Sequence, residues 1–177
     1  MPAPKKVVVI GPESTGKSTL CSALAAHYQT SWVPEFAREY LLGLGRPYRY
    51  DDLLLIAEGQ LRTEDEMTKQ MTGKILFIDT DMYVMKVWCE FVFGKCFPFI
   101  LDQIAERSYD LYLLCNTDLP WVKDELREYP DPVNRNKLFR IYKDLLINQH
   151  CPWVEIRGLN EERIQQAIEA VGKWLLQ

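Results

Sequence analysis

Residues 7 to 18 read Val-Val-Val-Ile-Gly-Pro-Glu-Ser-Thr-Gly-Lys-Ser, and this stretch decides the fold. Its first four residues are a short apolar, β-branched run, which predicts a buried strand. The next eight match the pattern G-x-x-x-x-G-K-[ST], and a run that favours helix begins at Thr19. A strand, a glycine-containing turn and a helix in this order form the context of a phosphate-binding P-loop. The stretch therefore predicts an α/β protein that binds a nucleoside triphosphate.

Each part of the predicted P-loop has a role toward the phosphates. Backbone N–H groups and the positive end of the following helix would hold them. Gly11 and Gly16 let the backbone approach the phosphates closely and adopt φ values that other residues avoid. Lys17 would reach the β- and γ-phosphates, and the Ser18 hydroxyl would ligate Mg²⁺. The other loop residues expected at the triphosphate are Glu13, Ser14 and Thr15.

Length and composition suit a single domain over residues 1–177. Hydrophobic residues make up 47% of the chain and charged residues 26%, with a formal net charge of −4. The acidic balance argues against nucleic acid as a partner. The apolar run before Gly11 is too short for a signal peptide, and no run is long enough to span a bilayer. Five cysteines without metal-ligand spacing indicate reduced thiols, so we expect a cytoplasmic protein without membrane contact.

Short apolar runs alternate with helical stretches along the chain. This alternation predicts βαβ units and a three-layer fold, in which helices cover both faces of a parallel sheet of about five strands. Two helices are clear from their apolar spacing: residues 54–71, and a last helix that ends near Leu175 after Asn160 as N-cap. The expected strands are residues 7–10, 31–33, 75–78, 111–115 and 153–156.

Two carboxylates follow the third expected strand. Asp79 ends a buried apolar run, and in a sheet that also carries a P-loop this position can hold Mg²⁺ directly or through water. Asp81 suits two roles that do not exclude each other. It can cap the next helix, or it can act at the metal and the phosphoryl acceptor.

The segment from Pro34 to Tyr40 follows the second expected strand. Ligands of an open parallel sheet bind beyond the carboxyl ends of its strands, so these side chains are expected to face the acceptor. Glu35 could take the proton of an attacking hydroxyl or hold ribose hydroxyls. Arg38 could bind the acceptor, or it could pair with Glu35 on the helix surface. Tyr40 completes the expected acceptor-binding set.

Residues 119–137 carry three prolines, alternating charge and few residues of the buried type. A segment of this length without a core pattern is typical of a functional lid or a disordered loop. An arginine delivered by a closing lid can stabilise charge on a transferring phosphoryl group. Arg127 is our main candidate, with Arg135 and Arg140 nearby, and a solvated charged loop is the alternative interpretation.

Taken together, the chain resembles the ribosylnicotinamide kinase domain of bacterial NadR-type NAD-biosynthesis proteins, in the AAA_28 family of P-loop ATPases and kinases. The resemblance runs over roughly residues 6–171. Its most specific element is the pattern Pro-Trp-Val-x-Asp-x-x-Arg at residues 120–127. The other carriers are residues 11–18, 33–40, 56–60, 77–81 and 110–114.

The resemblance implies transfer of the γ-phosphoryl group of ATP to the 5′-hydroxyl of nicotinamide riboside, a small-molecule substrate. It implies that Lys17, Ser18 and Thr19 handle the triphosphate and Mg²⁺. Asp79 and Asp81 would serve the metal and substrate side. The riboside pocket would hold Glu35 and Arg38, and the lid would carry Arg127.

Four side chains are our candidates for the catalytic step, and the adenine is expected near Gly158 after the fifth strand. Two alternatives stay open: a kinase for another nucleoside or a nucleotide on the same fold, and an ATP-binding regulatory module that hydrolyses ATP slowly. The catalytic candidates are Lys17, Asp81, Glu35 and Arg127.

Overall fold

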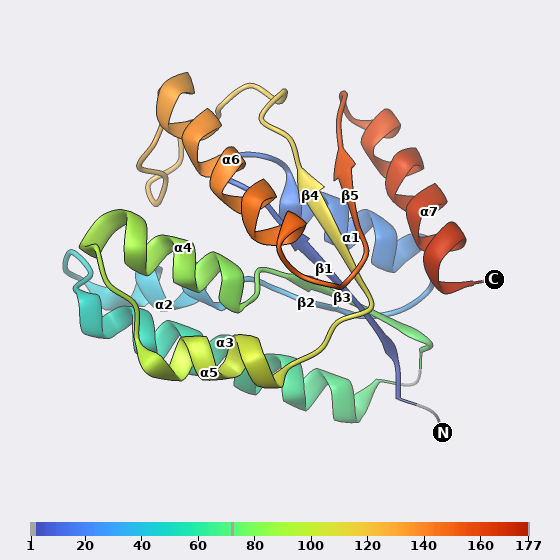
Figure 1. The fold of residues 1–177 in the computed structure, drawn as a ribbon, viewed down its shortest axis with the longest axis horizontal. Coiled ribbons are helices and arrows are strands. Elements are labelled where there is room, and N and C mark those ends of the chain that lie inside the picture. The colour runs from blue at the N-terminus through green and yellow to red at the C-terminus, as the bar shows by residue number, and fades with distance from the viewer. Residues whose placement is uncertain (1–2, 72, 177) are drawn as a thin grey trace.

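Five parallel strands form one sheet in the order β2-β3-β1-β4-β5 (Figure 1). The computed structural model describes residues 3–71 and 73–176. The predicted parallel sheet is confirmed, and the last two strands begin and end where the sequence pattern placed them. The strands are β1 (Lys5–Ile10), β2 (Trp32–Val33), β3 (Ile75–Asp79), β4 (Leu111–Cys115) and β5 (Trp153–Ile156).

Helices cover both faces of this sheet, which confirms the three-layer architecture (Figure 1). α1 and α7 pack on one face, whereas α4 and α6 pack on the other. The helices are α1 (Lys17–His27), α2 (Phe36–Leu44), α3 (Tyr50–Gln70), α4 (Met82–Phe93), α5 (Pro98–Glu106), α6 (Pro132–Ile147) and α7 (Glu161–Leu175).

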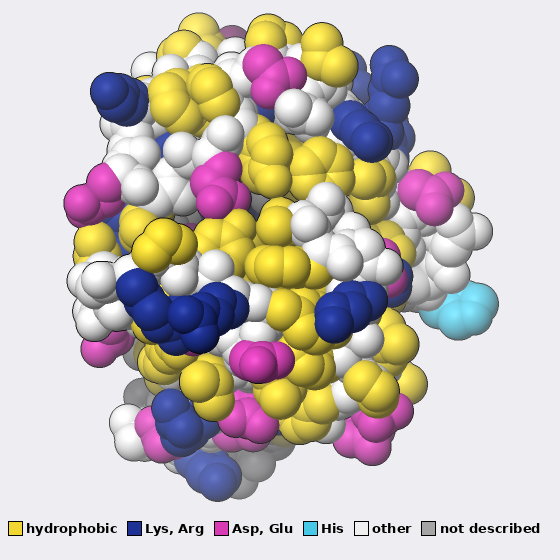
Figure 2. All heavy atoms as spheres, turned by 90° about the vertical axis from the view of Figure 1, so that its left-hand side faces the viewer, with side chains coloured by type: hydrophobic (Ala, Val, Ile, Leu, Met, Phe, Trp, Pro, Cys, Tyr) yellow, Lys and Arg dark blue, Asp and Glu magenta, His cyan; other side chains and the backbone are white. Residues whose placement is uncertain are grey.

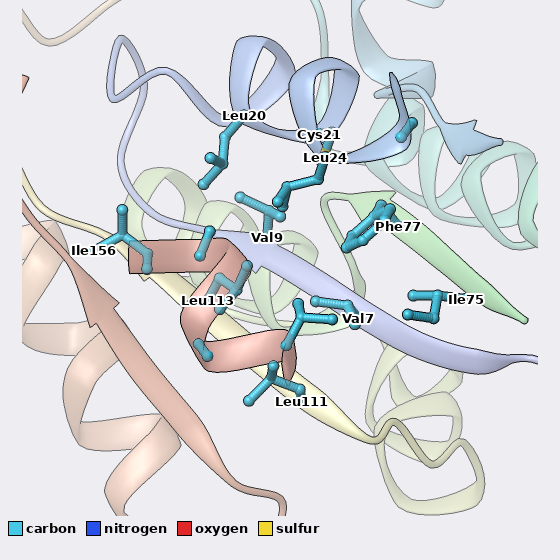
Figure 3. Close-up of a cluster of buried hydrophobic side chains, with 14 of the residues drawn as sticks. Val7, Val9, Leu20, Cys21, Leu24, Ile75, Phe77, Leu111, Leu113 and Ile156 are labelled. Atoms are coloured by element: carbon cyan, nitrogen blue, oxygen red, sulfur yellow. The ribbon is translucent and has the colours of Figure 1, made fainter. Parts of the chain in front are cut away.

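The core is built on the alternation of side chains along the central strand β1. Val7 and Val9 point toward α1 and α7, as Figure 3 shows, whereas Val8 and Ile10 point toward α4 and α6. All four side chains are fully buried. Burial of an aliphatic side chain of this size contributes roughly 1.5–3 kcal/mol, so the two cores hold the P-loop strand rigidly in the middle of the sheet.

A third apolar cluster joins α2, α3, α4 and α5. This cluster packs beneath the segment that follows β2 and begins α2. Helix α3 begins at Tyr50, four residues before the predicted start, because the Asp52 carboxylate accepts the Arg49 backbone N–H at 2.6 Å and closes the first turn. Among the described residues, no helix has the length and apolar character needed to cross a membrane.

The structure shortens one expected irregular segment, and it confirms Asn160 at the N-cap position of α7 without the expected side-chain cap. The segment 119–137 is irregular only up to Asp131, because Pro132 is the first residue of α6 and Asp131 caps it by accepting the Asn134 N–H at 2.8 Å. The proline starts the helix, since the missing N–H is not needed there. Asn160 precedes α7, but its side chain makes no capping hydrogen bond, and the Glu162 carboxylate accepts the Leu159 N–H at 3.0 Å instead.

Candidate active site

A cavity of about 480 Å³ lies at the carboxyl ends of β1 and β3, where the strand order reverses. This is the place where open α/β sheets bind ligands. The whole P-loop lines it on one side. The remaining walls come from the start of α2, one side of α4, residues 124–129 and α6. The topology therefore brings segments that are far apart in the sequence around one space.

The P-loop has the backbone that the motif requires. Gly16 has φ +77° and Ser14 has φ +56°, so the chain turns through the left-handed region at two places. An added Cβ at Gly11 would lie 2.8 Å from the Cys115 carbonyl oxygen, which explains the glycine there. Lys17 Nζ donates to the Pro12 carbonyl at 2.9 Å, so its ammonium group lies across the loop. The lysine faces the cavity, as the motif predicts.

Ser18 lines the cavity, and the fully buried Asp79, which does not line it, contacts the Ser18 hydroxyl. The Ser18 hydroxyl donates to the Asp79 carboxylate at 2.5 Å, although the two residues are 61 positions apart. Burial raises the pKa of Asp79, and the Lys17 charge opposes this shift. A hydroxyl and a carboxylate are oxygen ligands of the kind that Mg²⁺ prefers, so this pair fits the metal. No cluster of three or more His, Cys, Asp or Glu side chains occurs in the described part of the chain, so the other ligands would be phosphate and water.

Asp81 is buried and does not line this cavity, and both of its carboxylate oxygens have partners within the protein. Its carboxylate caps α4 by accepting the backbone N–H groups of Tyr83 at 3.0 Å and Val84 at 3.4 Å. The Tyr112 hydroxyl donates to its other oxygen at 2.7 Å. Thr80, with φ +80°, turns the chain so that the neighbouring carboxylates point to different places. Of the two roles left open, the structure supports the helix cap.

Glu35 lines the cavity opposite the P-loop, at the end of β2. Burial raises the pKa of its carboxyl, and Lys17 is the largest opposing influence. Sequence reasoning missed the residue that holds this segment in place. Gln60 of α3 accepts the Phe36 N–H at 2.8 Å and donates to the Asp79 carbonyl at 3.2 Å. A buried glutamine on the apolar side of a predicted helix was the available signal.

The other two residues of the expected acceptor set have protein partners. Tyr40 lies outside the cavity lining, and its hydroxyl donates to Asp52 at 2.8 Å. It supports the α2–α3 connection and does not reach the acceptor space. Arg38 does line the cavity, but both guanidinium nitrogens donate to Asp124, at 3.3 Å and 3.0 Å. The expected surface pair between Arg38 and Glu35 is replaced by this pair.

The irregular segment 116–131 lies closed on the P-loop. The Ser14 hydroxyl accepts the Val122 N–H at 2.9 Å. The Glu13 carboxylate accepts the N–H of Glu128 at 3.0 Å and also that of Tyr129. These contacts join loop side chains to lid backbone across more than a hundred residues, so we call residues 116–131 the lid.

Arginine side chains occupy distinct places around the lid. Arg127 lines the cavity and donates to the Val122 carbonyl at 2.6 Å. Arg135 belongs to α6, is 7% exposed, and donates to the carbonyls of Ser14 at 3.2 Å and Leu119 at 3.1 Å. Its Nε has no hydrogen-bond partner among the described residues, and burial lowers its pKa. Arg140 is exposed on α6 and does not line the cavity.

Gly158, expected near the adenine, does not line the cavity. Its N–H donates to Asp118 at 2.6 Å, and its carbonyl accepts from Arg163 at 3.2 Å. Arg163 also donates to the Thr15 carbonyl at 3.0 Å. The loop after β5 is therefore fastened beside the P-loop, next to the base of the lid.

Aromatic side chains form the wall that sequence reasoning missed. Trp88 of α4 donates from Nε1 to the Tyr48 hydroxyl at 3.1 Å, and the two rings meet edge to face at 5.2 Å. Phe91, Tyr129 and Tyr142 line the same cavity. Because α4 is apolar nearly all round, its sequence indicated a core helix and hid the side that faces a ligand.

Figure 2 looks at the end of the molecule toward which α2, α4 and the lid extend in Figure 1. Hydrophobic side chains occupy much of the middle of this face, and Lys and Arg side chains lie on both sides of them. This end of the molecule therefore presents apolar surface together with Lys, Arg, Asp and Glu side chains. That combination suits a ligand with an aromatic part and a phosphate part.

Comparison with known proteins identifies the family. The AAA domain family AAA_28 matches residues 6–163. The chain belongs to this family. The chain is 30% identical over 172 residues to the Trifunctional NAD biosynthesis/regulator protein NadR of Salmonella typhimurium (strain LT2). It has the same identity to the protein of that name from Escherichia coli (strain K12). The match covers 94% of this chain and 42% of each relative, so the chain spans less than half of their length.

Solved structures place the AAA_28 chain among P-loop kinase folds. A NadR protein in complex with NR superposes with a TM-score of 0.82 at 24% identity, over 99% of this chain and 52% of that one. A NadR protein in complex with NAD and AMP-PNP has a TM-score of 0.79 at 24% identity, and the match covers 99% of this chain and 50% of that one. Thymidylate kinase from Ehrlichia chaffeensis has a TM-score of 0.67 at 13% identity, and the match covers 96% of this chain and 100% of that one. At these identities the likeness shows the fold.

Proposed function

We propose that the chain is an ATP-dependent kinase that phosphorylates the 5′-hydroxyl of nicotinamide riboside and so produces nicotinamide mononucleotide. The observation that carries this proposal is the cavity at the reversal of strand order. Its lining combines the P-loop, the half-buried Glu35 carboxylate, an aromatic wall and a lid arginine. A hydrolytic switch has no need of an aromatic acceptor wall opposite the phosphates, so the cavity favours transfer to a small acceptor.

The residues divide the work of phosphoryl transfer by position. The P-loop backbone and Lys17 would bind and orient the β- and γ-phosphates. Ser18 and Asp79 would hold Mg²⁺, which supplies charge neutralisation at the phosphates when bound. Arg127 would stabilise the charge that develops on the transferring group. The adenine is proposed to lie by the loop at residues 158–159.

Glu35 is the proposed acceptor-side carboxylate, because Asp81 is occupied as a helix cap. It lines the cavity across from Lys17 and can accept a hydrogen bond from the attacking hydroxyl. Phosphoryl transfer depends mainly on positioning and electrostatics. Loss of the Glu35 carboxylate should therefore reduce turnover less than loss of Lys17.

The charges around the cavity favour a nucleoside over a nucleotide as acceptor. Arg38 is paired with Asp124, and Arg46 is paired with Asp52, so neither is free for an acceptor phosphate. The nicotinamide ring of the riboside is itself cationic. Aromatic faces attract such a ring, and carboxylates nearby reinforce the attraction. The cavity lining supplies both, with the rings of Tyr48, Trp88 and Phe91 and the carboxylates of Glu13, Glu35 and Glu128.

The test is phosphorylation of a nucleoside panel by the pure protein. The chain is incubated with ATP and Mg²⁺, and each product is examined by mass spectrometry for the gain of one phosphate. We expect nicotinamide riboside to be phosphorylated with the highest kcat/KM. Failure with this compound but success with another nucleoside or a nucleotide would replace the acceptor. ATP consumption that is equal with and without every acceptor would replace the kinase by a regulatory ATPase.

Lys17→Ala tests the P-loop assignment in the same assay. Removal of the charge that contacts the phosphates should lower kcat by about 100-fold or more. Lys74→Ala is the matched control, because this exposed lysine precedes β3 at the opposite end of the sheet. Turnover of Lys17→Ala within about threefold of the parent would contradict the assignment. Removal of Mg²⁺ with a chelator should abolish transfer in both the parent and the control.

A further inference from the structure

Two contacts tie the lid to the acceptor side of the cavity. The first is the pair between Arg38 and Asp124, in which both guanidinium NH groups meet both carboxylate oxygens. The second runs from Trp88 through the Tyr48 hydroxyl, which donates to the Glu128 carboxylate at 2.9 Å. They join residues that are 86 and 80 positions apart in the sequence. Both contacts are made by side chains on the acceptor side of the cavity and not by the P-loop.

Asp124 stands at the centre of the turn that presents Arg127. Its carboxylate accepts the Leu126 N–H at 3.1 Å, and its backbone carbonyl accepts the Arg127 N–H at 3.2 Å. The Arg127 guanidinium folds back to the Val122 carbonyl in the same turn. Whatever holds Asp124 in place therefore also holds Arg127 at the cavity.

Arg38 lies one helical turn after Glu35 on the segment that begins α2. Glu35, the candidate acceptor carboxylate, is thus connected to Arg127, the candidate phosphate arginine, through Arg38 and Asp124. The pair holds the pKa of Asp124 below its usual range and raises that of Arg38. Both groups stay charged at neutral pH, so formation of the ion pair does not depend on uptake or release of a proton there.

We propose that Arg38 and Asp124 form a clasp that sets the position of Arg127 over the acceptor carboxylate, which makes Arg38 a positioning residue and not an acceptor ligand. The lid is thus held on both sides of the cavity. The clasp holds it on the acceptor side, and Glu13 and Ser14 hold it on the P-loop side. The catalytic part of this proposal rests on the proposed function. The structural part does not.

The exposure of the clasp allows it to open. The Arg38 side chain is 51% exposed and that of Asp124 19%, so water screens the pair, and its contribution lies near the low end for ion pairs. A tighter, buried pair would hold substrate and product inside. A partly exposed bidentate pair gives direction to the closed lid and still permits release.

Hydrogen exchange of the ligand-free protein tests the structural part. The amides of Val122, Glu128 and Tyr129 donate to P-loop side chains, so their exchange rates report whether the lid is seated. Arg38→Gln and Asp124→Asn each break the pair, and the asparagine keeps an acceptor for the Leu126 N–H. We expect each to accelerate exchange of these amides by about twofold to fivefold, the range set by partly exposed ion pairs.

The double variant Arg38→Gln/Asp124→Asn distinguishes a clasp from two separate effects. If the residues act as a pair, the double variant exchanges about as fast as either single variant, because the second change removes nothing more. Effects that multiply, or amides that exchange at the parent rate in both single variants, would overturn the clasp. Lys123→Gln is the matched control, because this exposed lid residue makes no ion pair within the described residues.

Kinetics then test the positioning role. Both single variants should lower kcat for phosphoryl transfer by a similar factor of about threefold to tenfold, with a smaller change in the acceptor KM. Arg38→Lys should recover part of the loss. A large increase in acceptor KM for Arg38→Gln that Asp124→Asn does not share would make Arg38 an acceptor ligand and reject the clasp. If no acceptor is phosphorylated at all, the proposed function fails, and the exchange result still decides the clasp.

Discussion

At the scale of single residues, Asp79 and Asp81 show how two carboxylates two positions apart acquire different tasks. The left-handed backbone of Thr80 costs about 1–3 kcal/mol and separates their directions. Asp79 faces the Ser18 hydroxyl, whereas Asp81 accepts three hydrogen bonds from α4 and Tyr112. The strain is tolerated because it lets one carboxylate meet the P-loop serine and the other cap α4.

Asp81→Asn should change how stability depends on pH. Burial raises the pKa of Asp81 to about 6. Between the unfolded value near 4 and this value the folded state binds more protons than the unfolded state, so rising pH removes stability, up to roughly 3 kcal/mol by pH 7. Asparagine keeps the cap and cannot titrate. Relative to the parent, we expect the variant to gain stability between pH 4 and pH 7.

Urea unfolding at several pH values measures this difference. Both proteins share every other titrating group, including Glu35 and Asp79, so the difference between their unfolding free energies isolates Asp81. A difference that stays constant from pH 4 to pH 7 would show that the Asp81 carboxyl does not have the raised pKa that its burial gives it.

At the scale of elements, the contact between α2 and α3 fixes the acceptor side. Gly59 of α3 lies against the Phe36 ring, and an added Cβ would come within 2.1 Å of it. Gln60, the next residue, holds the Phe36 backbone. The two helices therefore approach closely at the one place where the chain leaves β2, and this approach sets where Glu35 points.

Gly59→Ala should destabilise the protein, although alanine is the better helix former. The methyl group must displace the Phe36 ring, and such overpacking costs about 1–3 kcal/mol, against a propensity gain of at most about 1 kcal/mol. Gly172→Ala in α7 is the matched control, since nothing lies within 4 Å of its added Cβ. It should stabilise by about 0.5–1 kcal/mol. Chemical denaturation compares the two, and equal gains in stability would refute the Phe36 contact.

At the scale of the whole molecule, the P-loop, the lid and the acceptor wall form one closed structure around the cavity. Side chains of Glu13 and Ser14 seat the lid backbone, and Arg135 of α6 joins the lid base to the loop. A ligand that bridges these parts should stabilise the folded state as a unit, because it binds only when all of them are in place.

A non-hydrolysable ATP analogue with Mg²⁺ should therefore raise Tm. At a concentration about 100 times its Kd the gain is about 2.7 kcal/mol, or roughly 5–10 °C for a chain of this size. Without Mg²⁺ the shift should be much smaller, because Ser18 and Asp79 then have no ion to share with the phosphates. Thermal unfolding measures both, and a Tm that does not respond to the analogue would contradict triphosphate binding at this loop.

Much of the fold and part of the candidate site followed from local pattern. Apolar runs and the P-loop predicted the sheet, and the places of Lys17, Ser18 and Asp79 follow from strand ends in a parallel sheet. The aromatic wall did not, because a residue such as Trp88 on an apolar helix gives the same signal whether it faces core or cavity. The protein partners of Tyr40 and Arg38 could not be predicted, because Asp52 and Asp124 lie outside the segment that contains them.

The sequence by itself determined the parallel sheet, the P-loop and the nature of the ligand at its phosphate end, since these depend on periodicity and on contacts within a few residues. Only the tertiary structure decided which side chains line the cavity and which arginine pairs with the lid. The lid contacts join residues 80 to 116 positions apart in the sequence. Such contacts arise from packing, which no local pattern encodes.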